Sequence, residues 1–313
     1  MADQANHYEA IVIGSGHNGL IAANYLAREG KRVLVLERRD VIGGAAVTES
    51  PRPGYNLSTC SYVCNLLLPE VVHDFDLPRH GYEIRAFEPG YFTPFPDGRF
   101  FMTFHDDEKT REQIRKFSEK DVAGYDAYWE MWNRILARMQ PFLRRELASP
   151  EEFADVFKGA EGEDDWDTLT RKSIAEVLDR YIESDEIKAP LSTGGVIGTN
   201  AGPFDEGTAY IKFHHLIGTV EGRQGAWGYV RGGMGSITKA LASAGIEMGV
   251  TIHTSAEVEE IDVSLGRATR VRLTDGRRFT SDVILSNADP QRTFLGMLGR
   301  EHLPTDYADA IAA

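Results

Sequence analysis

Three glycines near the start of the chain have the spacing G-x-G-x-x-G. The hexad consists of Gly14, Ser15, Gly16, His17, Asn18 and Gly19. Residues 9–13 before it have buried-strand character, and helical apolar spacing follows it. In this setting the first glycine permits a tight turn, the second lets a pyrophosphate approach the backbone, and the third lets the helix pack closely on the strand. Because free N–H groups at a helix start attract anions, the hexad predicts a dinucleotide site.

A second predicted strand, residues 32–36, ends on Glu37. Gly30 is a plausible stop for the helix between the two strands. A carboxylate at the position of Glu37 can accept hydrogen bonds from both ribose hydroxyls of an adenosine. It would also repel a 2′-phosphate, so NADP is the least expected ligand. At this point NAD and FAD both remain open.

Strand and turn signals continue in two later regions. Residues 81–104 predict strands with a hairpin turn at 96–98, and Asp275-Gly276 predicts a second hairpin. Residues 226–261 predict a strand, a glycine-rich passage, a helix and further strands, and residues 282–286 predict a buried strand. Residues 194–198 are glycine-rich but lack the G-x-G-x-x-G spacing. We therefore expect no second dinucleotide domain for NADH.

The middle of the chain is predicted to be helical. Thr110 with Gln113, and Ser173 with Glu176, have the spacing of capping boxes, and Ser118 with Asp121 opens a longer helix. The apolar and aromatic stripe of that helix is typical of core packing, with a substrate-lining role as the alternative. Its positions are Val122, Tyr125, Trp129, Trp132, Leu136, Met139 and Leu143. The acidic stretch 161–167 is predicted to be a solvated loop or a disordered tip.

Composition excludes several classes of function. The net charge is −14, with 42% hydrophobic and 26% charged residues, which describes a globular protein without a nucleic-acid surface. No apolar run is long enough for a transmembrane segment, and no targeting segment is evident, so we expect a cytoplasmic protein that could still make peripheral apolar contact with a membrane. Cys60 and Cys64 are more consistent with inert thiols than with a redox pair. The histidine spacing predicts no metal site.

Several motifs resemble those of FAD-dependent flavoproteins of the phytoene-desaturase-like and amine oxidase superfamily. Their signature continues from the acidic residue through Arg38 to a Gly-Gly pair, here Gly43-Gly44 followed by Ala45. Ser-Thr-Cys-Ser-Tyr at 58–62 and Trp-Gly-Tyr-Val-Arg-Gly-Gly-Met-Gly at 227–235 resemble the branch of pyridine nucleotide-disulfide oxidoreductase domain-containing protein 2. The resemblance implies that FAD is the cofactor, that residues 43–45 pass beside the flavin, and that the backbone at Val258 contacts the adenine.

The resemblance also implies an α/β fold, with a Rossmann-like FAD-binding domain of the GR2 type and an inserted α+β substrate domain. We expect residues 1–78 and 224–290 to form the FAD domain, and residues 79–223 and 291–313 to form an incomplete substrate domain. Members of the superfamily continue well beyond the equivalent of Ala313, in a segment that closes over the flavin. We therefore expect this part to be missing from the chain.

The sequence identifies no firm catalytic residue. His215, which with His214 is predicted to lie on a strand, could act as an acid or base, and Arg231 could position a carboxylate or carbonyl; structural roles are the alternative for both. The primary hypothesis is an FAD-dependent oxidoreductase that abstracts hydride from a small apolar substrate, a polyene for example, in dehydrogenation or isomerisation. The alternatives are an amine oxidase-type flavoenzyme and a non-catalytic protein that binds FAD or a partner.

Overall fold

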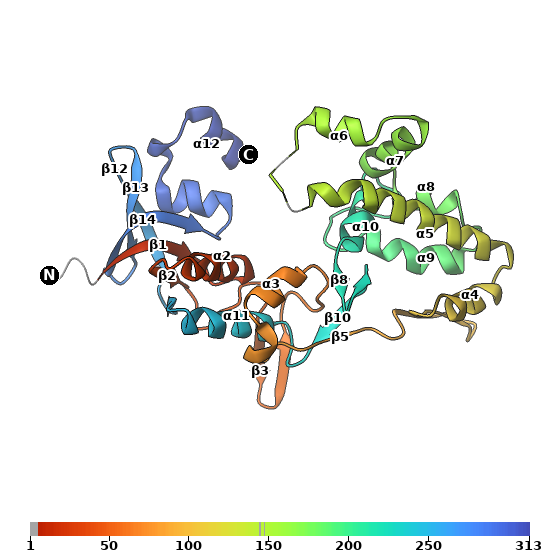
Figure 1. Cartoon of the computed structure of the whole chain (residues 1–313), viewed down its shortest axis with the longest axis horizontal. Helices are drawn as coiled ribbons and strands as arrows, with labels where there is room; N and C mark the ends of the chain where they lie inside the picture. The colour runs from red at the N-terminus through yellow and green to blue at the C-terminus, as the bar shows by residue number, and fades with distance from the viewer. Residues whose placement is uncertain (1–5, 144, 147) are drawn as a thin grey trace. The chain divides into compact units, whose positions relative to one another are not determined.

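The computed structural model describes residues 6–143, 145–146 and 148–313 (Figure 1). The chain separates into two compact units. Unit 1 contains the described residues of Met1–Cys64, together with Leu68–Arg85 and Tyr229–Ala313. Unit 2 contains Asn65–Leu67 and Ala86–Gly228. Apart from the short stretch Asn65–Leu67, the chain passes between the units within β5 (Ile84–Ala86) and β10 (Gly228–Val230), later than the predicted boundaries at 78 and 224.

Unit 1 is built on a six-stranded sheet with the order β11-β2-β1-β14-β13-β12. Its strands are β1 (His7–Ile13), β2 (Val33–Leu36), β11 (Thr251–His253), β12 (Val258–Ser264), β13 (Arg267–Leu273) and β14 (Arg278–Ser286). Strand β1 is parallel to β2 and to β14, β2 is parallel to β11, and β13 is antiparallel to both β12 and β14. Strands from both ends of the chain therefore lie in one sheet. The hairpin predicted at Asp275-Gly276 is confirmed between β13 and β14.

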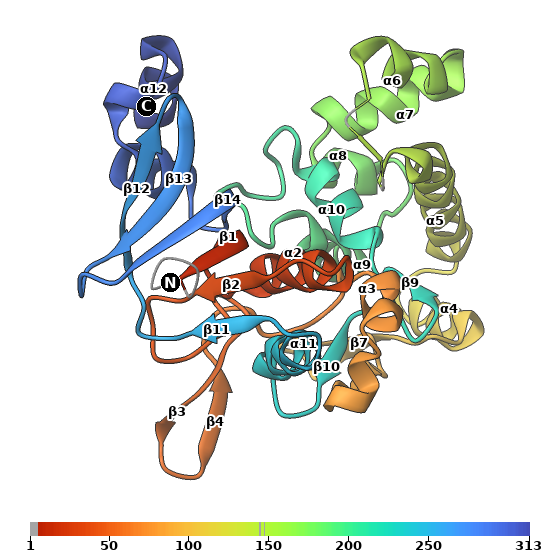
Figure 2. The ribbon, with the colours of Figure 1, turned by 60° about the vertical axis from the view of Figure 1, so that its left-hand side comes forward.

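Side chains of β1 and β2 alternate between the two faces of the sheet, because successive strand residues point to opposite sides. One face packs against helix α2 (His17–Arg28), and its buried residues are Ala10, Val12, Val33 and Val35. The other face packs with β12 and β13, and its buried residues are Ile11, Ile13, Leu34 and Leu36. Helix α11 (Gly235–Glu247) lies beside α2 (Figures 1 and 2), where Asn24 Nδ2 donates to the Leu241 carbonyl at 2.8 Å.

The remaining elements of unit 1 are short. They are the hairpin β3 (Thr48–Arg52) and β4 (Tyr55–Ser58), seen at the lower edge of Figure 2, α3 (Pro69–Asp74), η1 (Leu77–His80), η4 (Gln291–Leu298), η5 (Arg300–His302) and α12 (Thr305–Ala312). Residues 291–313 belong to this unit, whereas the sequence analysis placed them with the second domain. The physical reason is apolar packing, because Met297 of η4 is buried against Val258 and Ile261 of β12.

Unit 2 is mainly helical. Its helices are α4 (Asp107–Arg115), α5 (Lys120–Met139), η2 (Gln140–Phe142), α6 (Pro150–Val156), α7 (Ala160–Arg171), α8 (Ile174–Asp179), α9 (Asp185–Ser192), η3 (Thr193–Gly195) and α10 (Thr208–Leu216). Two antiparallel hairpins accompany them, β6 (Tyr91–Pro94) with β7 (Phe100–Thr103), and β8 (Thr219–Val220) with β9 (Arg223–Gln224). Tyr128 and Trp132 of α5 are fully buried. Of the predicted stripe, Tyr125 and Trp132 are buried core residues and Val122, Trp129, Leu136 and Met139 pack against that core, whereas Leu143 lies beyond α5 and is exposed. Among the described residues, no helix combines the length and apolarity that a membrane crossing requires.

Two sequence predictions in unit 2 are wrong: one concerns the residue that caps a helix, and the other assigns a helical segment to a strand. Helix α4 is capped by Asp106, whose side chain accepts from Glu108 N and Lys109 N, while Thr110 bonds to Phe104 instead. His214 and His215 lie on helix α10 and not on a strand. The capping box of Ser173 and Glu176 is confirmed at α8. These outcomes differ because several polar residues near 106–113 could cap, whereas only one pair fits at 173–176.

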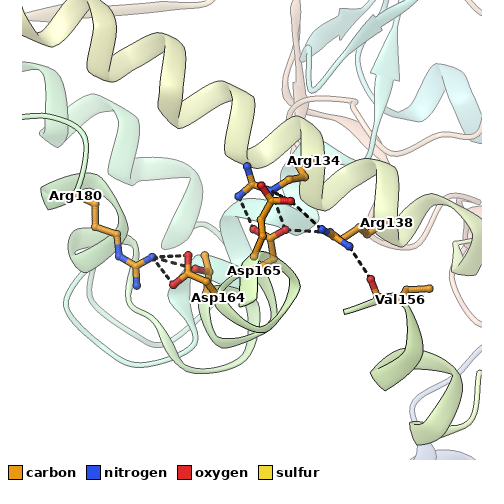
Figure 3. A network of polar contacts seen from close by, with 8 residues as sticks. Arg134, Arg138, Val156, Asp164, Asp165 and Arg180 are labelled. Carbon is orange, nitrogen blue, oxygen red and sulfur yellow. Dashed lines mark hydrogen bonds and ion pairs between the residues drawn. The ribbon is translucent and has the colours of Figure 1, made fainter. Parts of the chain in front are cut away.

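The acidic stretch 161–167 was predicted to be a loop, but it lies within helix α7. Asp165 is fully buried there and accepts from Arg134 Nη2 at 2.7 Å and from Arg138 Nε at 3.1 Å (Figure 3). Both arginines come from α5. Glu161 and Glu163 lie in the first turn, where negative charge is stabilised by the helix dipole. The loop prediction failed because the arginines that neutralise Asp165 come from α5, a different helix, and are not part of the acidic stretch itself.

Candidate cofactor-binding site

The glycine hexad lies at the carboxyl end of β1, where the chain turns into α2. The Gly14 N–H donates to the Leu36 carbonyl at 2.8 Å, which ties the turn to β2. At Gly19 an added Cβ atom would lie 2.2 Å from the Gly14 carbonyl oxygen, so no larger residue fits without moving the backbone. Gly16 is the N-cap of α2 and has no side-chain cap. The free N–H groups of the first helical turn are therefore available to an anion.

Glu37 follows directly after β2 and is only 6% exposed. Its Oε2 accepts from Ser15 N at 2.9 Å and from Ser15 Oγ at 2.7 Å, and its Oε1 accepts from Arg39 N at 3.0 Å. These donors hold the carboxylate in one orientation beside the glycine turn. A carboxylate has about four lone-pair sites, so Oε1 keeps capacity for a hydroxyl donor. Ser15 thus contacts Glu37 with its side chain, and it positions the acid.

The predicted Gly-Gly pair packs on the hexad. Gly43 forms an isolated parallel bridge with Gly16, and its N–H donates to the Ser15 carbonyl at 3.1 Å. Gly44 has a φ of 56°, and a Cβ atom there would lie 3.1 Å from Gly16 Cα. The two glycine segments therefore approach each other so closely that side chains at either would separate them.

A cavity of about 350 Å³ opens at this edge of the sheet, entirely within unit 1. The predicted cofactor residues that line it are Gly14, Gly16, His17, Asn18, Glu37, Arg38, Gly44, Ala45 and Val258. The other three predicted residues, Ser15, Gly19 and Gly43, do not line the cavity but contact residues that do, as described above. Burial lowers the pKa of His17, so its imidazole is neutral near pH 7.

Sequence reasoning missed part of the lining. The missed residues are Ile13, Leu36, Ala256, Glu257, Asn287, Ala288, Arg292 and Met297. One signal could have located the residues after 286. A buried strand was predicted at residues 282–286, and the carboxyl ends of neighbouring parallel strands meet at the same edge of a sheet. The pairing of that strand with β1, which decides the matter, is not evident from either segment alone.

The two catalytic candidates lie in different units. His215 Nδ1 lies 2.9 Å from the carbonyl oxygens of both Gly194 and Ile211, so this nitrogen acts as a donor to main-chain acceptors. Arg231 is 81% exposed in its side chain and pairs with Glu83 at 3.0 Å. These contacts are structural in kind, and a catalytic role for either residue stays a prediction.

The two cysteines are free thiols in the structure. Cys60 is exposed and Cys64 is buried, so the pair forms no disulfide here. Burial and the neighbouring Cys64 together raise the pKa of Tyr82. The arrangement agrees with the interpretation of Cys64 as an inert, packed thiol.

Comparison with known proteins identifies relatives over nearly the whole chain. The family described as flavin containing amine oxidoreductase matches residues 19–312. The mouse (Mus musculus) pyridine nucleotide-disulfide oxidoreductase domain-containing protein 2 is 37% identical over 97% of this chain and 57% of its own length. A neurosporene-forming phytoene desaturase from Cereibacter sphaeroides is 28% identical over 96% of this chain and 56% of its own.

The same fold occurs in solved structures. Cyclohexylamine oxidase from Brevibacterium oxydans superposes with a TM-score of 0.56 at 22% identity, over 97% of this chain and 63% of that protein. The chain thus spans a little more than half the length of the curated relatives it matches. The resemblance inferred from the motifs is confirmed, the fold is α/β with a Rossmann-like sheet, and the matching family is described as flavin-containing, which agrees with the expected FAD. The chain belongs to the flavin-containing amine oxidoreductase family.

Proposed function

We propose that the cavity of unit 1 binds the adenosine and diphosphate portion of FAD. The observation that carries this proposal is the glycine turn standing beside a carboxylate that is already held in place. The N–H groups at the start of α2 would receive the diphosphate, Glu37 would accept from the ribose hydroxyls, and the backbone at Val258 would contact the adenine. Each of these groups lines the same cavity.

The fixed orientation of Glu37 determines which nucleotide fits. Three donors hold the carboxylate before any ligand arrives, so little ordering is required when a ribose binds. A 2′-phosphate at that ribose would bring a second anion against the buried acid. Like charges in so buried a setting repel strongly, so the site discriminates against NADP.

We infer that the whole protein is an oxidoreductase acting on an apolar substrate, with polyenes included. When bound, FAD accepts a hydride from a substrate C–H. In dehydrogenation the substrate also loses a proton, and a double bond forms. In isomerisation the hydride returns at another carbon. The support for an apolar substrate is the similarity to phytoene desaturase across almost the entire chain.

A second candidate is amine oxidation, in which the hydride leaves the carbon beside an amine nitrogen, the nitrogen lone pair forms the C=N bond, and loss of an N–H proton gives the imine. The family description and the shared fold with cyclohexylamine oxidase favour it. Both candidates use the same cofactor site in unit 1. They differ in the substrate that must reach the flavin, so substrate-dependent reduction separates them.

Binding of FAD is tested first by equilibrium dialysis and by the absorbance of the bound flavin. We expect stoichiometric binding, competition by ADP, and weaker competition by ADP with a 2′-phosphate. Glu37→Gln should weaken FAD binding by about ten-fold, since it weakens a charge-assisted hydrogen bond. Glu112→Gln, at an exposed acid of α4, is the matched control and should leave the affinity unchanged.

Catalysis is tested by anaerobic reduction of the bound flavin with a carotenoid-type polyene and with primary amines. Bleaching by the polyene alone would support the first candidate, and bleaching by amines alone would support the second. A flavin that binds but is reduced by neither class would indicate a non-catalytic FAD-binding protein. Equal affinity of the Glu37→Gln variant and the parent for FAD would refute the assignment of the cavity.

A further inference from the structure

The segment after β14 forms one wall of the FAD cavity and carries two polar side chains outside the glycine motif. These are Asn287 and Arg292, which line the cavity together with Ala288 and Met297. The Asn287 N–H donates to the Ile13 carbonyl at 2.8 Å and so extends the pairing of β14 with β1. This contact fixes the backbone of Asn287 beside the glycine turn, and the residue itself is exposed.

The Asn287 amide lies directly against the glycine turn. Its Nδ2 is 2.8 Å from the point that a Cβ atom would occupy at Gly16, and 3.3 Å from the corresponding point at Gly19. Within the described residues, no hydrogen bond joins this amide to another protein group. A side chain at position 16 would therefore clash with the amide of Asn287 as well as with the diphosphate that the motif is expected to bind. The Asn287 amide N–H is therefore available as a donor at the place where the phosphates are expected to bind.

Arg292 adds positive charge to the same wall. It lies in the first turn of η4, with 52% of its side chain exposed. Its guanidinium pairs loosely with Asp289, whose Oδ2 is 3.9 Å from Arg292 Nε, too far for a hydrogen bond, while Asp289 Oδ1 accepts from the Arg292 backbone N–H at 2.8 Å. The other charged or titratable residues lining the cavity are Glu37, Arg38, Glu257 and His17. Arg38 follows Glu37, the residue expected to bind the ribose. Arg292 is therefore the cation that the segment after β14 contributes to the cavity.

We propose that Asn287 and Arg292 form a side-chain half of the diphosphate site, opposite the backbone half made by the glycine turn. Asn287 donates to a phosphate oxygen, and Arg292 pairs with the diphosphate charge. Hydrogen bonds to phosphate with a charged partner are roughly twice as strong as neutral ones, so two such contacts would raise affinity for the cofactor markedly. The inference rests on the proposed function, because it concerns the same cavity.

The test compares ligands that share the adenosine and differ in phosphate. Dissociation constants for FAD, ADP and adenosine are measured by flavin fluorescence and competition for the parent, Asn287→Ala, Asn287→Asp and Arg292→Gln. We expect Asn287→Ala to weaken FAD and ADP by about ten-fold and Arg292→Gln by about three- to ten-fold. Adenosine affinity should not change. Asn287→Asp should weaken FAD more than Asn287→Ala, because an anion replaces the donor.

Arg267→Gln provides the matched control for loss of one exposed positive charge, since Arg267 lies in the same unit at the β12–β13 turn, outside the cavity lining. Raising the salt concentration should weaken FAD binding less in Arg292→Gln than in the parent or the control. The inference is overturned if the Asn287 and Arg292 variants bind FAD as the parent does, or if they lose adenosine and FAD equally. If instead the parent itself binds no FAD, it is the proposed function that fails.

Discussion

Removing the buried charge of Asp165 should destabilise unit 2 more than removing an exposed charge from the same network. Asp165 is fully buried and accepts from Arg134 Nε at 3.0 Å, Arg134 Nη2 at 2.7 Å and Arg138 Nε at 3.1 Å (Figure 3). Asp165→Asn keeps the shape but removes the charge and turns an amide N–H toward the arginines. Glu161 is the internal control, because it contacts the same two arginines from the same helix with 63% of its side chain exposed.

The magnitude follows from burial. Breaking a buried ion pair by removing one partner costs about 3–5 kcal/mol. The arginines are 30% and 25% exposed and can turn partly toward water, so we expect about 2–4 kcal/mol for Asp165→Asn. Glu161→Gln should cost less than about 1 kcal/mol, as exposed pairs do. The expected difference between the two variants is therefore large enough to measure.

Urea unfolding followed by tryptophan fluorescence is a suitable assay. All four tryptophans of the chain lie in unit 2, at positions 129, 132, 166 and 227, so the signal reports this unit. FAD binding to unit 1, measured on the same samples, should be unchanged in both variants. A loss below about 1 kcal/mol for Asp165→Asn, or a loss equal to that of Glu161→Gln, would refute the reasoning from burial.

Three further predictions concern single positions. Gly19→Ala should abolish FAD binding in dialysis and lower the free energy of unfolding by about 1–3 kcal/mol, because its Cβ atom meets the Gly14 carbonyl; normal FAD affinity would contradict this. Ser15→Ala should weaken FAD binding in the same assay, less than Glu37→Gln does, because the Ser15 N–H still holds the acid; an unchanged affinity would contradict the positioning role. Lys212 of α10 is 5% exposed, and burial lowers its pKa from 10.5 to about 8. The unfolded state then binds the extra proton between these values, so the stability of unit 2 should rise with pH from about 8 to about 10.5, by up to about 3 kcal/mol, and Lys212→Met should remove that rise in urea unfolding; an identical pH profile in the variant would contradict it.

The sequence by itself determined the part of the site that is contiguous in the chain. The strand, glycine turn, helix, second strand and Glu37 follow one another within a short stretch, and each residue's role depends on its immediate neighbours. Gly19, for example, meets a carbonyl only five positions earlier. The parallel and hairpin strands were likewise evident from apolar runs and the Asp275-Gly276 turn, because those signals are local.

Only the tertiary structure decided which residues from distant parts of the chain lie at the site or in the core. Asn287 and Arg292 arrive at the glycine turn because β14 pairs with β1, although some 270 residues separate the two strands. Asp165 is buried in a helix, where its stretch had suggested a solvated loop, because Arg134 and Arg138 of α5 supply its hydrogen bonds. Residues 291–313 join unit 1 because Met297 packs on β12. In each case the deciding free energy lies in a contact between distant segments, and the local pattern of neither segment contains it.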